Sequence, residues 1–172
     1  MFNKLLRENN IVAGFLTVLR LILGWSFLTA GWGKITGGFD ASGFLQNAIA
    51  NPVARDGEMV YGWWVSFLEG FALPNVGLFN FLVAWGEFLV GLGLILGCLT
   101  TAAAFFGLVM NFSFMLSGTV SHNPTDILMG VLIAAAGMNA GKFGLDRWVI
   151  PYLRNLVNKG KGEESHKSVS AS

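Results

Sequence analysis

Two oppositely charged side chains stand inside the longest apolar runs of this chain. Glu87 lies within VAWGEFLVGLGLILG, residues 83–97, and Arg20 lies within the apolar run 11–32. Ionisable groups at such places bind protons, ions or head groups, or else form an ion pair that fixes the register of two helices. We take Arg20 and Glu87 as the candidate catalytic residues, with the structural ion pair as the open alternative.

The composition places these charges in a membrane protein. Of 172 residues, 53% are hydrophobic and 12% are charged, whereas soluble domains carry about 25% charged residues. The net charge of +1 gives no reason to expect nucleic-acid binding. The single cysteine, Cys98, excludes an intramolecular disulfide and a thiolate-rich metal site, and we predict no metal site.

Four apolar segments are candidates to cross the membrane, which takes about 20 residues each. They are residues 11–32, 76–97, 99–116 and 125–140. The second and third meet at GCLTT, which predicts a tight helical hairpin. The sequence therefore predicts an all-α, four-helix transmembrane bundle over residues 1–151, followed by a polar, disordered cytoplasmic tail over residues 152–172.

The largest extramembrane segment, residues 36–75, is predicted to contain a short amphipathic helix. Trp64, Phe67, Leu68 and Phe71 fall on one helical face. Such a helix lies at a membrane interface, where tryptophan is enriched. Two roles remain open for this helix. One is a lid or packing helix, and the other is a substrate-binding element.

The distribution of Lys and Arg predicts the orientation. Eight of the eleven basic residues lie in the two tails, namely Lys4, Arg7, Lys142, Arg147, Arg154, Lys159, Lys161 and Lys167. Basic residues are retained on the cytoplasmic side of membranes. We predict a multi-pass protein of the cell membrane with both termini in the cytoplasm.

The same orientation places Arg20 and Glu87 at one depth. Each lies about nine or ten residues from the cytoplasmic end of its span, or about 14–15 Å at 1.5 Å per residue. Glycines on the same faces allow close helix approach. The faces hold Arg20, Gly24, Phe27, Gly31 and Lys34 in the first span, and Glu87, Gly91 and Leu94 in the second. We expect Arg20 and Glu87 to pair.

Further polar residues gather toward the outer side and form the predicted substrate-binding set. These are Trp32, Lys34, Asn111, His122, Asn123 and Asp126. The alternative for Asn123 and Asp126 is capping of the fourth helix in the turn sequence HNPTD. His122 is interpreted as a loop residue rather than an iron ligand.

Several stretches together resemble the DoxX/DoxD family, which includes the large subunit of thiosulfate:quinone oxidoreductase. They are LRLILGWSFLTAGWGKI, FLEGFALPNVGLFNFLVAWGEFLVGLGLILG, NFSFMLSGTVSHNP and AGKFGLDRWVIP. The resemblance implies a four-helix membrane protein linked to the quinone pool, with thiosulfate as one electron donor. It also implies a DoxA-like or soluble redox partner. In that setting Arg20 would bind a quinone oxygen and Glu87 would deliver protons.

Two other functions remain open. One is a non-enzymatic membrane scaffold or receptor for a soluble redox or detoxification enzyme. The other is a small transporter, for which a homo-oligomer would be needed because four short spans are few for a monomeric transporter. The expected partners are membrane lipid and quinone, which is a membrane substrate rather than a bound cofactor.

Overall fold

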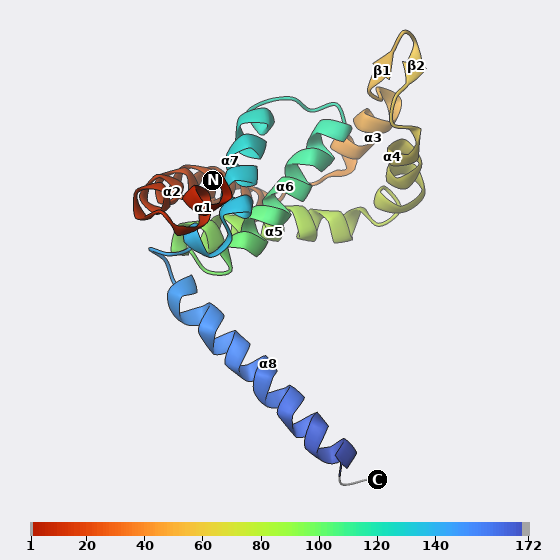
Figure 1. Ribbon diagram of the computed structural model, residues 1–172. Helices are drawn as coiled ribbons and strands as arrows, with labels where there is room; N and C mark the ends of the chain where they lie inside the picture. Colours follow the sequence, from red (N-terminus) through yellow and green to blue (C-terminus); the bar gives the residue numbers. More distant parts are fainter. Residues whose placement is uncertain (1, 170–172) are drawn as a thin grey trace.

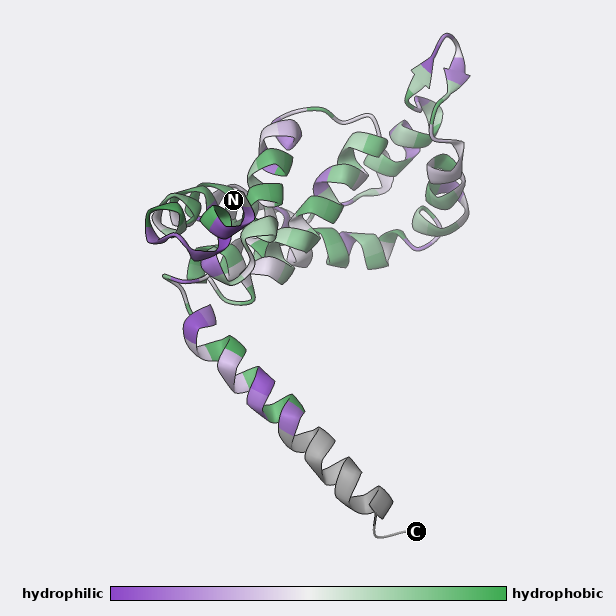
Figure 2. Cartoon of the chain, viewed as in Figure 1, coloured by the Kyte–Doolittle hydropathy of each residue, from purple (hydrophilic) through white to green (hydrophobic). Residues whose placement is uncertain are grey.

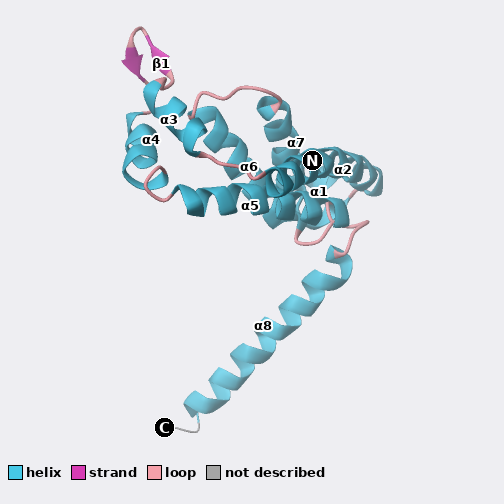
Figure 3. Ribbon diagram, turned by 180° about the vertical axis from the view of Figure 1, so that it is seen from behind, coloured by secondary structure: helices cyan, strands magenta, loops and turns pink. Residues whose placement is uncertain are grey.

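The computed structural model describes residues 2–169, and these residues are helical apart from turns and one short hairpin (Figures 1 and 3). The elements are α1 (Phe2–Glu8), α2 (Asn10–Gly37), α3 (Ser42–Ala50), β1 (Ala54–Arg55), β2 (Glu58–Met59), α4 (Gly62–Phe67), the π-helix η1 (Leu68–Ala72), α5 (Val76–Leu96), α6 (Thr100–Leu116), α7 (Asn123–Ala136), the 3-10 helix η2 (Gly137–Asn139) and α8 (Asp146–Val169). The all-α prediction is confirmed.

Two helices, α2 and α5, have the length and apolar composition needed to cross a membrane. Helix α6 is apolar but has 17 residues, and α7 has 14. All four begin and end close to the predicted segments, and Figure 2 shows hydrophobic residues along much of their length. Membrane crossing by α6 and α7 remains a prediction.

Helix α2 is longer than the predicted first span, and its ends show why. The side chain of Asn9 caps the first turn by accepting the backbone N–H groups of Ile11 at 2.8 Å and Val12 at 3.2 Å. The helix ends where Gly38 adopts a left-handed conformation with φ of 69°. The extra turn beyond residue 32 keeps Lys34 inside the helix.

Glycines join α2 and α5 into a close antiparallel pair. A Cβ on Gly31 would overlap the backbone of Phe88, and a Cβ on Gly91 would overlap the backbone of Leu28. Gly24 packs in the same way against Leu94 and Gly91. The predicted glycine-bearing faces of both helices are therefore confirmed.

Helix α6 turns back from α5 as the sequence predicts. Gly97 ends α5 with φ of 63°, and Leu99 precedes α6 with φ of 50°. Helix α7 then packs on α6, where Gly130 lies against Leu108. The largest fully buried side chains among the described residues are Leu16, Leu23, Leu94, Ile133 and Thr100.

The segment between α2 and α5 forms a helical cap at one end of the bundle (Figure 1). The predicted short helix is present as α4 and η1, which follow one another directly, and the segment also contains α3 and the antiparallel β1–β2 hairpin. Its own apolar core includes Leu45, Leu68 and Ala72, with Trp64 packed against it. The indole N–H of Trp64 donates to the Ser117 hydroxyl at 3.0 Å, which ties the cap to the end of α6.

Helix α8 extends away from the bundle (Figure 1). It runs from Asp146 to Val169 and so crosses the predicted boundary between a membrane domain and a disordered tail. The division at residue 151 remains a prediction, and the last part of the predicted tail, residues 170–172, lies outside the described residues.

Candidate functional site

The buried carboxylate in the apolar run pairs with a lysine. The Nζ atom of Lys34 on α2 lies 2.5 Å from Oε2 of Glu87 on α5. The Glu87 side chain is 5% exposed and that of Lys34 is 26% exposed. The predicted pairing of Glu87 with Arg20 is therefore wrong, although Lys34 belongs to the same predicted face of the first span.

The register of the two helices explains the change of partner. Gly31 of α2 lies beside Phe88 of α5, whereas Arg20 lies beside Gly97. Gly97, the cap of α5, comes ten positions after Glu87, which corresponds to about 15 Å along the helix axis. Counting from the ends of the apolar runs missed this offset, because in the antiparallel packing the start of α2, residues 10–19, extends beyond the end of α5 at Leu96.

Arg20 instead occupies the opposite end of the bundle. It is buried, its guanidinium lies against Gly97 and Gly144, and Nη1 donates to the carbonyl of Ala140 at 3.4 Å. The carboxylate of Asp146 attracts its charge. Through these contacts Arg20 holds the α5–α6 turn against the start of α8.

Asp146 is a residue to which the sequence analysis gave no role. Its carboxylate accepts the backbone N–H groups of Leu99 at 2.6 Å and Thr100 at 2.9 Å, where α6 begins. Its own N–H donates to the carbonyl of Gly97 at 2.7 Å. The aspartate thus caps α6 from 46 residues away in sequence. In the sequence, Asp146 stands out only as an isolated acidic residue in the stretch GLDRW.

The second ion pair lies at the start of α7. The Nδ1 atom of His122 lies 2.6 Å from Oδ2 of Asp126, one helical turn away. The histidine side chain is 65% exposed, while that of the aspartate is 6% exposed. Asp126 therefore orients the largely exposed His122 ring.

Two asparagines complete the polar cluster. The side-chain amide of Asn123 donates to Oδ1 of Asn111 at 2.9 Å, and that of Asn111 donates to the carbonyl of Gly107 at 3.1 Å. Asn123 also accepts the backbone N–H and the hydroxyl of Ser121, both at 3.0 Å. Asn123 therefore orders the turn before α7 and joins α7 to α6, but no side chain of the described residues caps the first turn of α7, so the alternative of capping by Asn123 is wrong.

One cavity of about 990 Å³ brings these groups together. Its polar lining includes Ser26, Lys34, Glu87, Asn111, Ser113, Ser117, Thr119, Ser121, His122, Asn123 and Asp126. Apolar side chains of α2, α5, α6 and the cap form most of the remainder, among them Phe27, Trp64, Phe67, Val90, Phe106 and Met110. Five predicted substrate-binding residues thus share one site.

Two predicted site residues are not part of this cavity. Arg20 lies at the other end of the bundle. Trp32 is largely exposed on the outer surface of α2, with its ring 6.0 Å from that of Phe88. Its exposure fits contact with lipid, since tryptophan is enriched at membrane interfaces.

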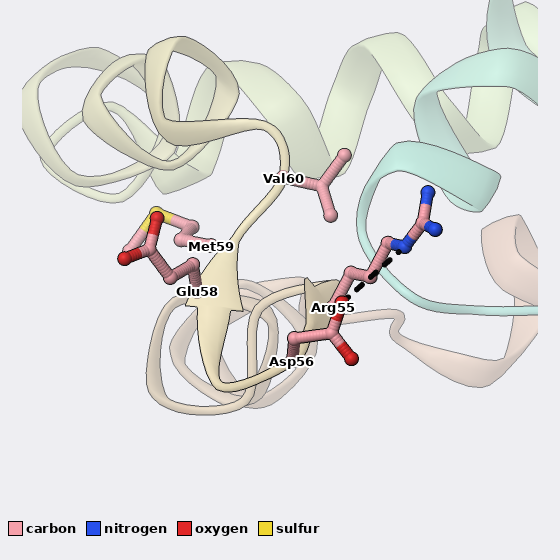
Figure 4. A pocket seen from close by; sticks show the side chains of 5 residues that line it. All are labelled: Arg55, Asp56, Glu58, Met59 and Val60. Atoms are coloured by element: carbon pink, nitrogen blue, oxygen red, sulfur yellow. Dashed lines mark ion pairs between the residues drawn. The ribbon is translucent and has the colours of Figure 1, made fainter.

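A second hollow of about 420 Å³ lies at the β1–β2 hairpin (Figure 4). It is lined by Arg55, Asp56, Glu58, Met59 and Val60. The side chains of Arg55 and Asp56 are 86% and 91% exposed, and their charged atoms are 3.6 Å apart. Such an open surface gives a ligand little burial, so we assign the candidate site to the larger cavity.

Comparison with known proteins identifies the family. No curated protein and no solved structure matches the chain. The family model described as DoxX matches residues 15–119, which include Lys34, Glu87 and Asn111 and end before His122 and Asp126. Because this match covers more than half of the 172 residues, the protein belongs to the DoxX family and is a membrane protein.

Proposed function

We propose that the protein is an integral membrane subunit that binds quinone in the large cavity and takes part in quinone-linked oxidoreduction. The observation that carries the proposal is the composition of one cavity. A slot of about 990 Å³ walled mostly by apolar side chains contains the Lys34–Glu87 pair. Ligand sites of this size combine apolar walls with a few placed polar groups, which suits an apolar ring with two carbonyl oxygens.

The residues at the polar end have complementary roles in this proposal. The ammonium group of Lys34 donates a hydrogen bond to one quinone oxygen. Glu87, the carboxylate partner of Lys34, takes up protons and passes them to that oxygen, and Asn111 supplies an amide for orientation. His122 is the exposed member of the cluster, so it exchanges protons with water. Proton transfer requires such groups within hydrogen-bond reach of the reacting oxygen.

The electrons come from a small reduced donor through a partner. Quinone accepts two electrons and two protons to become quinol, and the residues of this chain bind the ring and handle the protons. Thiosulfate is the donor suggested by family membership, and a DoxA-like or other soluble redox subunit is the partner.

The proposal includes a four-span topology with both termini in the cytoplasm. The contact of Trp64 with Ser117 places the end of α6 beside the cap, while Asp146 lies beside the α5–α6 turn. Helices α6 and α7 therefore connect the same two ends of the bundle as α5. The excess of basic residues in the two tails supports a cytoplasmic position for those ends.

The test is the quinone content of the purified protein. Wild type is purified in mild detergent, and extracted lipid is measured by ultraviolet spectroscopy before and after incubation with quinone. Lys34→Met/Glu87→Leu removes the polar anchor, while Arg55→Met/Asp56→Leu makes the same changes in the exposed hairpin pair. We expect near-stoichiometric quinone in wild type and in the hairpin variant, and loss from the cavity variant.

Two results would contradict the proposal. Equal quinone content in the two double variants would mean that the Lys34–Glu87 pair does not hold the ring. Wild type without quinone, even after incubation with it, would instead favour the non-enzymatic scaffold or receptor.

A further inference from the structure

Helix α8 presents two chemically different faces. At 100° per residue, Trp148, Tyr152 and Leu156 follow one another along one side of the helix, and Val149 and Leu153 flank them. Arg147, Arg154 and Asn158 follow one another on the opposite side. Figure 2 shows the resulting alternation of hydrophobic and hydrophilic residues along the first turns of α8.

The apolar face is uncovered in the described chain. The side chains of Trp148 and Tyr152 are 59% and 63% exposed, and Leu156 is also exposed. Contiguous exposed apolar surface of this kind marks a site that contacts a membrane or another protein.

The start of α8 is fixed close to the membrane surface. Its first residue, Asp146, binds the backbone of Gly97, Leu99 and Thr100 in the turn between α5 and α6. Because α5 is long enough to cross a membrane, the turn that ends it must lie at the boundary of the bilayer. The exposed apolar side chains of α8 follow within the next few turns.

The charges of α8 indicate which surface covers it. From residue 147 to residue 161 the sequence carries Arg147, Arg154, Lys159 and Lys161, and the first acidic residue after Asp146 is Glu163. The guanidinium of Arg147 lies 4.4 Å from the centre of the Trp148 ring. A basic polar face opposite a face of Trp, Tyr and Leu is typical of helices that lie in a membrane interface and bind anionic lipid.

We propose that the first half of α8, residues 146–158, is an anchor that lies along the bilayer surface and binds anionic phospholipid head groups. Trp148, Tyr152 and Leu156 enter the boundary between head groups and acyl chains. Arg147 and Arg154 contact the phosphates. This inference is independent of quinone binding, because no described residue of α8 lines the cavity.

The full-length protein can test it in nanodiscs of phosphatidylcholine, alone or with phosphatidylglycerol. In a Cys98→Ser background, a fluorophore is attached to a single cysteine at Leu156 or at Asn158, on opposite faces of α8. Quenching by neutral, water-soluble acrylamide reports exposure. With phosphatidylglycerol we expect the label at residue 156 to be protected several-fold more than that at residue 158. Without it, the difference should shrink.

A charge variant and its matched control separate lipid charge from apolar contact alone. Arg154→Gln should lower the ratio of membrane-bound to unbound α8 about fivefold in phosphatidylglycerol discs. Arg55→Gln removes the same charge from the exposed hairpin and should leave the ratio unchanged. Circular dichroism confirms that the variants keep their helix content.

Other results would overturn the inference. Equal quenching of the labels at residues 156 and 158 in both lipids would mean that α8 stays in water. If the label at residue 156 is protected equally in both lipids, and only in discs that hold two copies of the protein, the apolar face packs on a second copy of this chain.

Discussion

At the scale of single residues, the Lys34–Glu87 pair concentrates a large energetic cost in one place. The carboxylate is almost fully buried while the ammonium keeps some contact with the surroundings. Removing one partner from a buried pair leaves the other charge unpaired and costs about 3–5 kcal/mol, whereas replacing both by apolar groups is often close to neutral.

We therefore expect Lys34→Met to lower the free energy of unfolding by about 3–5 kcal/mol and Lys34→Met/Glu87→Leu to recover most of that loss. Arg55→Met, in the exposed hairpin pair, should change it by less than about 1 kcal/mol. Reversible unfolding in mixed micelles measures all three. Additive losses in the two single variants and the double would show that the residues are not coupled.

Asp146 supports a second prediction at this scale. Asp146→Ala leaves the N–H groups of Leu99 and Thr100 without their acceptor and removes the negative charge beside Arg20. We expect a loss of about 3 kcal/mol of unfolding free energy with unchanged quinone content, because Lys34 and Glu87, which hold the ring, lie about 15 Å along α5 from the turn that Asp146 caps. Asp56→Ala on the exposed hairpin is the control. Loss of quinone in a stable Asp146→Ala protein would contradict this separation.

At the scale of elements, the α2–α5 contact depends on certain glycines of these helices and not on others, because the free space around them differs. Gly31→Ala and Gly91→Ala would each force backbone apart, whereas an added Cβ at Gly33 or Gly14 meets no atom within 4 Å. We expect the first two to cost about 1–3 kcal/mol and the latter two to be neutral or stabilising by up to about 1 kcal/mol. Equal effects in both groups, measured by the same unfolding assay, would contradict close α2–α5 packing.

The cap gives a pH-dependent prediction. Asp40 accepts hydrogen bonds from the hydroxyl and backbone N–H of Ser42 and from the Asn80 amide, and these bonds hold the pKa of Asp40 below its ordinary value. A lowered pKa in the folded state stabilises the protein above the unfolded pKa of about 3.9. Wild type should therefore be more stable than Asp40→Asn at neutral pH, and the difference should disappear as the pH falls through the folded pKa. If the difference in stability persists in acid, it comes from the changed shape of the side chain and not from the charge of Asp40.

At the scale of the whole molecule, long apolar runs predicted α2, α5 and α6 well because nothing within them competes with a helix. Glycine spacing also predicted which faces meet. It did not predict the axial offset, because Arg20 and Lys34 lie on the same face of α2 and only the packed register selects between them. Asp146 was missed because its role depends on a contact with backbone 46 residues earlier in the sequence. The cap was oversimplified because α3, the hairpin and η1 follow no single period.

The topology itself gives the last prediction. In a Cys98→Ser background, single cysteines are placed at Glu58, Val120 and Asn158, which are all exposed. If α5, α6 and α7 all cross the membrane, a membrane-impermeant reagent added to intact cells should label residues 58 and 120 but not residue 158. If only α2 and α5 cross, residue 120 lies with residue 158 and escapes the reagent. Residue 120 therefore decides between four spans and two, since residue 58 lies opposite residue 158 in either case.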